Sequence, residues 1–354
     1  MASMIDWDVA LSTATRLVKP GPATTREAAA QTVAELRAAA VRAEAYVVEV
    51  TGLAVPSATA PVLVVDRPGW IQANLDGFRQ VLAPLGDRAA EALQPGAVAG
   101  AVSARVTGAE VGLLLSYLSP KVLGQFDPFH PGGASASGPG GRLLLVAPNV
   151  VAVERELGVV PADFRLWVCL HEETHRAQFT AVPWLRDHLN RQIEQVVDSA
   201  DLEPGALWQL VSTGVRRLAR ATRTGEEVSA VDLLQTPEQR EIVDRITAVM
   251  SLLEGHADVV MDSVGPSVVP TVAEIRRRFT VRRESQGADR LVRRLLGLDA
   301  KMRQYRDGAR FCRAVIDRVG MTGLNQVWSD PTALPSRAEI AQPELWLRRV
   351  AAAA

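Results

Sequence analysis

The sequence has little cysteine, almost no net charge and no long apolar run. Only two cysteines occur among 354 residues, Cys169 and Cys312, which excludes a disulfide framework and a cysteine-rich metal site. Both lie in apolar helical contexts, so we expect two small buried side chains. The formal net charge of −1 argues against broad electrostatic binding to nucleic acid or to an anionic membrane.

The sequence also lacks the features that direct membrane insertion and secretion. No window approaches the roughly 20 consecutive apolar residues that a membrane helix needs. The N-terminal residues lack the charged start, the apolar run and the cleavage site of a signal peptide. We therefore expect a cytoplasmic protein with a globular core, for which 47% apolar residues is a normal share.

Apolar residues at helical spacing predict that most of the chain is helical. The clearest predicted helices span residues 24–50, 161–180, 183–200, 205–221, 236–263, 270–296 and 298–319. Two apolar runs, at 61–69 and 141–150, predict short strands. The run between them, GAEVGLLLSYLSPKVLGQF, predicts a further helix that extends to Phe126. The expected fold class is therefore mainly α with a small sheet (α+β).

Few features divide the chain. The segment 127–141 is rich in Gly, Ser and Pro and predicts a loop. No repeat at a fixed period and no polar linker is present, so we expect one domain over 1–354. The alternative is a helical N-terminal layer, 1–120, followed by a metal-binding body, 121–354.

The stretch LWVCLHEETHRAQF, residues 166–179, places two histidines four residues apart with a glutamate directly after the first. Pro161 suits the first turn of a helix that carries this stretch. Residues four apart on a helix lie one above the other, so His171 and His175 point the same way and can bind one zinc ion. Glu172 projects at a different angle and can take a proton from a zinc-bound water. The remaining polar residues are expected at the surface or behind the ligands: Glu173, Thr174 and Arg176.

A catalytic zinc ion typically has three protein ligands and an open position for water. One arrangement needs a histidine or aspartate six residues after His175 and a glycine at the third, but Ala181 and Gln178 occupy those positions. The other route is an acid on a later helix, and the segment 248–265 supplies Glu254 in an apolar run. A lone carboxylate there is costly unless it binds a charge. We therefore expect Glu254 to be the third ligand.

Two further acids follow Glu254 at helical spacing, Asp258 and Asp262. Either can accept a hydrogen bond from the outer ring nitrogen of a zinc-bound histidine and fix its tautomer. His256 is the alternative metal ligand, but it lies about 200° round the helix from Glu254, so the two cannot both face the metal. Gly255 is small and is expected to let this helix approach the histidine helix closely.

These residues, together with longer stretches, resemble a bacterial family of zincin-like hydrolases described as zinc-dependent metalloproteases. Some members of that family are associated with biosynthesis of the deazaflavin coenzyme. The similarity spans essentially the whole chain. The matching stretches are IDWDVA, VVDRPGWIQANLDGF, LLLVAPNV, RLWVCLHEETHRAQFTAVPWLRDHL, LLEGHADVVMD, LGLDAKMRQYRDGARF and LNQVWSDPTALPSRAEIAQPELWLRRV.

The resemblance implies a zincin-like core with a small sheet and many added helices. It also implies that His171 and His175 ligate zinc and that Glu172 is the catalytic acid and base. Glu254 as the third ligand carries over from zincins with an E-G-x-A segment, which this chain matches from Glu254 to Ala257.

The expected activity is zinc-dependent hydrolysis of a peptide or a small amide, with Glu172 passing a proton from water to the leaving amine. Tyr305 is the first candidate donor to the developing oxyanion, with His256 and Arg306 behind it. The strand predicted at 141–150 is a candidate for pairing with an extended peptide substrate, although an apolar core strand explains it nearly as well.

Two other function classes fit parts of the pattern. A zinc-stabilised scaffold or binding protein would keep the metal site without turnover, although it would not need Glu172 beside the ligands. A helical interaction protein without metal is the third class. Neither nucleic acid nor a membrane is an expected partner, and nothing in the sequence specifies an oligomeric state.

Overall fold

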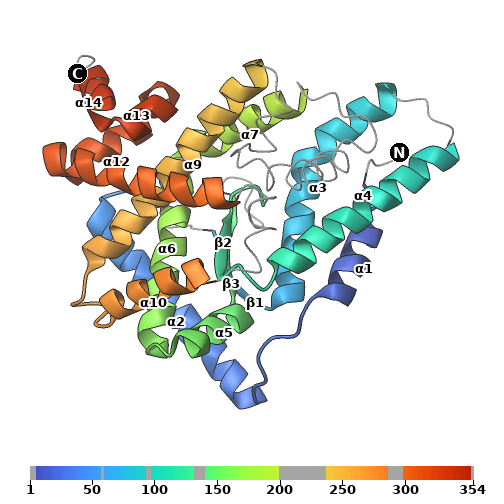
Figure 1. Cartoon of the computed structure of the whole chain (residues 1–354), viewed down its shortest axis with the longest axis horizontal. Coiled ribbons are helices and arrows are strands. Elements are labelled where there is room, and N and C mark those ends of the chain that lie inside the picture. The colour runs from blue at the N-terminus through green and yellow to red at the C-terminus, as the bar shows by residue number, and fades with distance from the viewer. Residues whose placement is uncertain are drawn as a thin grey trace, which may run out of the picture. The chain divides into compact units, whose positions relative to one another are not determined.

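The computed structural model describes residues 5–56, 60–92, 97–130, 140–198, 237–285 and 298–351. Helices account for most of these residues, and three short strands form one sheet (Figure 1). The predicted fold class, mainly α with a small sheet, is confirmed. The helix predicted at 205–221 lies outside the described residues. Within the described part of the chain, no helix is long and apolar enough to cross a membrane.

The three short strands lie among long helices in the first half of the chain, and the described elements after β3 are all helical. In chain order they are α1 (Trp7–Leu17), α2 (Arg26–Thr51), β1 (Val62–Val65), α3 (Arg67–Ala92), α4 (Ala97–Leu118), β2 (Gly124–Asp127), β3 (Arg142–Val146), α5 (Ala147–Leu157), α6 (Pro161–Ala181), α7 (Pro183–Asp198), α9 (Pro237–Val264), α10 (Val272–Ser285), α12 (Leu298–Leu324), η1 (Asn325–Trp328), η2 (Pro331–Ala333), α13 (Arg337–Ala341) and α14 (Pro343–Ala351).

The chain groups into two compact units. Unit 1 comprises Met1–Val48, Ala54–Ala181 and Val264–Arg276; unit 2 comprises Glu49–Leu53, Val182–Ser263 and Arg277–Ala354. A single domain over 1–354, or a division at residue 120, stays a prediction.

The sheet of unit 1 has the order β1-β3-β2. β3 pairs in parallel with β1 and antiparallel with β2, so both of its backbone edges are occupied within the sheet. All five residues of β3 are buried. The suggestion that the strand at 141–150 pairs with a substrate is therefore wrong, and its apolar letters instead reflect a central core strand. The strand also ends at Val146, where α5 begins.

The second strand, β2, was not predicted. The helix expected to extend to Phe126 ends at Leu118, and residues 124–127 form the strand that borders β3. α6 packs against β2 and β3 (Figure 1). This sheet edge therefore lies beside the helix that carries the two histidines.

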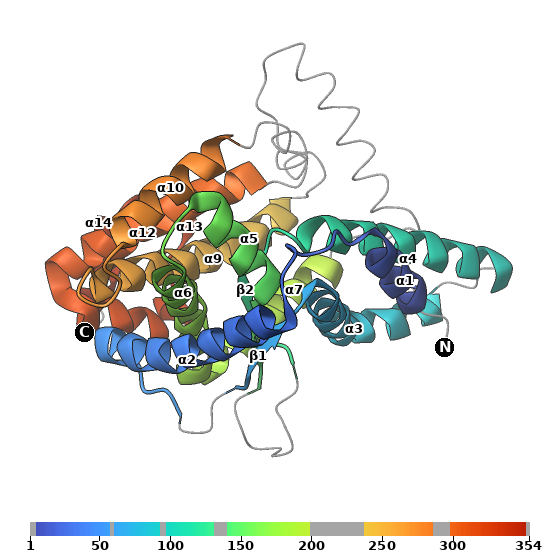
Figure 2. The same cartoon turned by 90° about the horizontal axis from the view of Figure 1, so that it is seen from below.

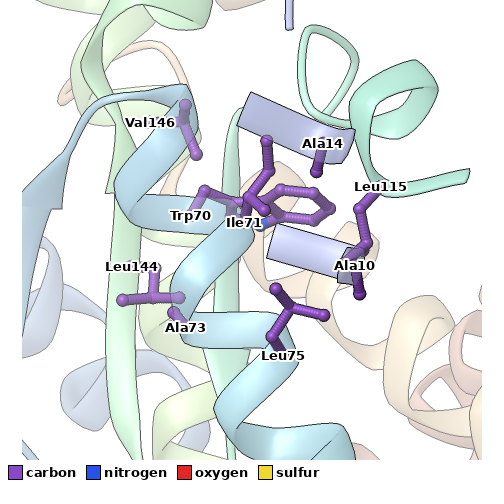
Figure 3. Close-up of a cluster of buried hydrophobic side chains, with 9 residues drawn as sticks. All are labelled: Ala10, Ala14, Trp70, Ile71, Ala73, Leu75, Leu115, Leu144 and Val146. Atoms are coloured by element: carbon purple, nitrogen blue, oxygen red, sulfur yellow. The ribbon is translucent and has the colours of Figure 1, made fainter. Parts of the chain in front are cut away.

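One hydrophobic cluster joins α1, α3, α4 and β3. Its buried members are Ala10, Ala14, Trp70, Ile71, Ala73, Leu75, Leu115, Leu144 and Val146 (Figure 3). α1 lies alongside α4 in both whole-chain views (Figures 1 and 2). The two helices come close because α4 presents Gly108 and Gly112 to α1; a β-carbon at these positions would lie 2.3 Å from Asp6 O and 2.4 Å from Ala10 O.

Unit 2 contains a second close helix pair, α9 and α12. A β-carbon at Gly255 would lie 2.1 Å from the carbonyl carbon of Gly308, and one at Gly308 would lie 1.8 Å from Ser251 O. Gly255 therefore faces α12, and the expectation that it lets α9 approach the histidine helix closely stays a prediction. In the same unit, Trp346 of α14 is fully buried, with its ring edge against Phe311 of α12.

Candidate metal centre

α6 is a buried helix that begins as the sequence predicts, at Pro161, and ends at Ala181. Asp163 lies in its first turn, where a negative charge interacts favourably with the helix dipole. The Asp163 carboxylate also accepts hydrogen bonds from the backbone N–H and hydroxyl of Thr271. Most residues from Phe164 to Thr180 are buried, so this helix is held in place by packing along its length.

His171 and His175 lie one turn apart on α6, as the spacing predicts. Their Nε2 atoms are 3.2 Å apart, and the rings meet edge to face with centroids 4.7 Å apart. Both side chains are partly exposed, whereas most of the neighbouring helix positions are buried. The two imidazoles therefore converge through the same type of nitrogen.

The outer nitrogen of His175 has a partner that the sequence interpretation missed. Nδ1 of His175 lies 2.9 Å from Oε1 of Gln178, whose side chain is fully buried. The signal was available, because residues three apart on a helix are neighbours. In the sequence, Gln178 is informative only because it occupies the position where another type of zinc site has a glycine.

Glu172 is buried, and its side chain lies beside the first residue of β2. A β-carbon at Gly124 would be 2.6 Å from Glu172 Cγ and 3.0 Å from Oε1. This position needs glycine for space, since its φ is not among the positive values found at five other glycines. The backbone of β2 therefore forms one wall around the carboxylate.

Behind the histidines, Glu173 and Arg176 form a buried ion pair rather than a surface pair. Arg176 Nε lies 2.5 Å from Glu173 Oε2, and its Nη2 lies 2.9 Å from the carboxylate of Glu44 on α2. Burial raises the pKa of Glu173 to about 7, although Arg176 acts in the opposite direction. Thr174 is also fully buried, with its hydroxyl bonded to Leu170 O. Of the two places expected for these residues, the surface is excluded, and their burial anchors the helix on its inner side.

Glu254, the predicted third ligand, lies on α9 in unit 2, whereas His171 and His175 lie in unit 1, so its grouping with the histidines stays a prediction. Two imidazole nitrogens and a carboxylate are the protein donors of a common type of catalytic zinc site. Two ligands about 2.0–2.1 Å from zinc at a tetrahedral angle are roughly 3.3 Å apart, close to the separation of the two Nε2 atoms. The two histidines therefore fit a zinc ion.

The other acids of α9 have a cationic partner in unit 2. Arg313 of α12 donates to Oδ2 of Asp258 at 2.9 Å and to Oδ2 of Asp262 at 2.8 Å. Their predicted role as acceptors for a zinc-bound histidine stays a prediction. His256, the alternative ligand, is fully buried with its ring against Trp328.

The candidate oxyanion donors are less defined. Tyr305 lies within α12, but its side chain is outside the described part of the structure. Arg306, on the same helix, is exposed. The role of Tyr305 therefore stays a prediction.

Comparison with known proteins gives a consistent result. A model of the zincin-like metallopeptidase family matches residues 5–347. Among solved structures, the chain is similar to a protein from Chloroflexus aurantiacus described as a "putative hydrolase with a novel fold". The two sequences are 31% identical, 98% of each chain is covered, and the TM-score is 0.70. No curated protein matches the chain. Together with the converging histidines of α6, these findings support a metal-dependent hydrolase.

Proposed function

Because this chain belongs to the zincin-like metallopeptidase family, we propose that it is a zinc-dependent hydrolase of a peptide or small amide bond. The observation that carries the proposal is the convergence of the two Nε2 atoms on α6, with Glu172 between the two histidines in sequence. In the proposal Glu254 supplies the third donor, which completes the usual set of protein ligands of a catalytic zinc site.

In this proposal His171, His175 and Glu254 hold the metal. A bound zinc ion supplies Lewis acidity, which polarises a carbonyl oxygen and makes a water more acidic. Glu172 does the proton work: a carboxylate oxygen takes a proton from the attacking water and then gives it to the nitrogen of the leaving amine.

The surroundings of Glu172 suit that role. The carboxylate is buried on a rigid helix and bounded by the backbone of Gly124. A base held in one place does not have to be reoriented during the reaction, and accurate placement of reacting groups accounts for a large part of enzymatic rate enhancement. Tyr305 is retained as the proposed donor to the oxyanion, and Asp258 and Asp262 as proposed acceptors near the ligands.

We also propose that the protein is cytoplasmic and forms a single domain. A link to deazaflavin coenzyme biosynthesis, with which some similar proteins are associated, is a further proposal. The substrate is proposed only as a class, peptides or small amides.

The test compares the parent protein with Glu172→Gln. Zinc content and hydrolysis of a broad peptide and amide panel are measured for both. We expect equal zinc in the two proteins, and hydrolysis only in the parent, because glutamine cannot accept the proton. Equal zinc with no hydrolysis by the parent over the whole panel would instead support a zinc-stabilised scaffold.

A further inference from the structure

The contact between His175 and Gln178 points to a residue that prepares the metal site. We infer that Gln178 is a positioning residue: its side-chain oxygen fixes the tautomer of His175 so that Nε2 presents its lone pair to the metal. This inference rests on the proposed zinc-dependent function and goes beyond it, since Gln178 itself is not a ligand.

The chemistry of the two side chains sets the tautomer. A neutral imidazole carries one N–H, on either Nδ1 or Nε2, and an amide oxygen can only accept a hydrogen bond. With Gln178 Oε1 2.9 Å from His175 Nδ1, the proton lies on Nδ1 and donates to the amide. Nε2 is then the unprotonated nitrogen, and an unprotonated ring nitrogen is the form that binds a metal.

The geometry on the other side of the ring agrees with this assignment. Nε2 of His175 points at Nε2 of His171, 3.2 Å away. Two ring nitrogens at this separation can both bind one cation, and without a cation the unprotonated Nε2 of His175 can accept a hydrogen bond from a protonated Nε2 of His171. The amide of Gln178 therefore holds His175 in the orientation that a bound metal needs.

Burial makes this contact effective. Gln178 is fully buried on the same helix, so its side chain cannot rotate freely into water. The nearest acid on the helix, Glu173, is instead paired with Arg176. A neutral amide also orients the histidine without adding another negative charge beside Glu172.

The experiment measures the tautomer and the zinc affinity of the full chain. The variant Gln178→Leu removes the acceptor at similar size, and Gln178→Glu keeps an acceptor. Thr180→Val is the matched control: Thr180 is a buried polar residue of the same helix, and its hydroxyl bonds only to its own helix at Arg176 O. The tautomer is read from ¹⁵N chemical shifts of the histidines in zinc-free protein at mildly alkaline pH. Affinity is read by competition with a chelator.

We expect His175 to carry its proton on Nδ1 in the parent, in Gln178→Glu and in Thr180→Val. In Gln178→Leu we expect a mixture of tautomers and zinc binding weakened roughly 10- to 100-fold, the usual effect of losing such a partner. A His175 protonated on Nε2 in the parent overturns the inference without any variant, as does Gln178→Leu with parental tautomer and affinity. If the parent binds no zinc, the proposed function fails, and the tautomer measurement still decides the role of Gln178.

Discussion

The backbone of Gly124 lies directly against the side chain of Glu172. A β-carbon at position 124 would come within 2.6 Å of Glu172 Cγ and 2.8 Å of its carboxyl carbon, closer than non-bonded carbon atoms approach. Only a glycine at position 124 therefore leaves room for the Glu172 side chain beside β2.

Gly124→Ala is expected to displace the Glu172 carboxylate and to reduce hydrolysis roughly 100-fold, as misplacement of a catalytic group by about 1 Å can do. Zinc content should not change, since no metal donor is touched. The measurement is hydrolysis of the best substrate of the parent, together with zinc content. Gly77→Ala is the control, because its β-carbon would have no neighbour closer than 3.8 Å. Parental activity in Gly124→Ala would contradict the proposal that Glu172, held beside Gly124, is the base.

The close contact between α9 and α12 predicts a stability effect in the other unit. Gly308→Ala places a β-carbon 1.8 Å from Ser251 O, so the helices must separate. Overpacking of this kind costs about 1–3 kcal/mol in the free energy of unfolding, measured by urea denaturation. Asp317→Ala, at an exposed position of the same helix, should change stability by less than about 0.5 kcal/mol. Equal stability of the two variants would show that the helix contact is looser than described.

The two cysteines are predicted to be unreactive in the folded protein. Cys169 and Cys312 are fully buried, and burial raises the pKa of both thiols above the ordinary value. Because the thiolate is the reactive form, iodoacetamide should label neither residue in native buffer and both in denaturant. Intact mass before and after treatment gives the answer. Rapid labelling of the native protein would refute the predicted burial.

Glu339 gives a pH-dependent prediction. Burial opposes its ionisation, but hydrogen bonds from Arg349 and Ser336 prevail and hold its pKa below the ordinary value. A carboxyl group whose pKa is lower in the folded than in the unfolded protein stabilises the fold at pH values above its pKa in the unfolded protein. This stabilisation is lost as the pH falls through its pKa in the folded protein. Glu339→Gln should therefore cost about 1–3 kcal/mol near neutral pH, and less in acid.

The control for Glu339 is Glu344→Gln, because Glu344 is exposed and pairs only at the surface with Arg318. This variant should cost less than about 1 kcal/mol. Thermal melts at several pH values compare the two. If the loss of stability caused by Glu339→Gln increased as the pH fell, the prediction would be contradicted.

The long helices were predictable because their apolar spacing extends over many turns. The predicted range 161–180 corresponds to α6 at Pro161–Ala181, and 236–263 corresponds to α9 at Pro237–Val264. β2 was missed because four residues, GQFD, are too few to show alternation and follow an apolar run that favours helix. The contact of β2 with Glu172 depends on how separate segments of the chain pair in the sheet, and no local sequence pattern encodes that pairing.

Within the candidate site, the sequence identified the chemistry better than the surroundings. The spacing of His171 and His175 was sufficient to predict that they converge. The burial of Glu173 and Arg176 could not be predicted, because their charges suggest solvent while their partner Glu44 lies far away in the sequence. Gln178 was visible at helical spacing from His175, but a glutamine is a common residue and carries no metal signal of its own.

The zinc content of the purified protein tests the central claim most directly. Elemental analysis of the parent should find about one zinc ion per chain, and His171→Ala, His175→Ala and Glu254→Ala should each lose most of it while remaining folded by circular dichroism. A parent protein that holds no zinc after incubation with the metal, or three variants that all hold as much as the parent, would contradict the account.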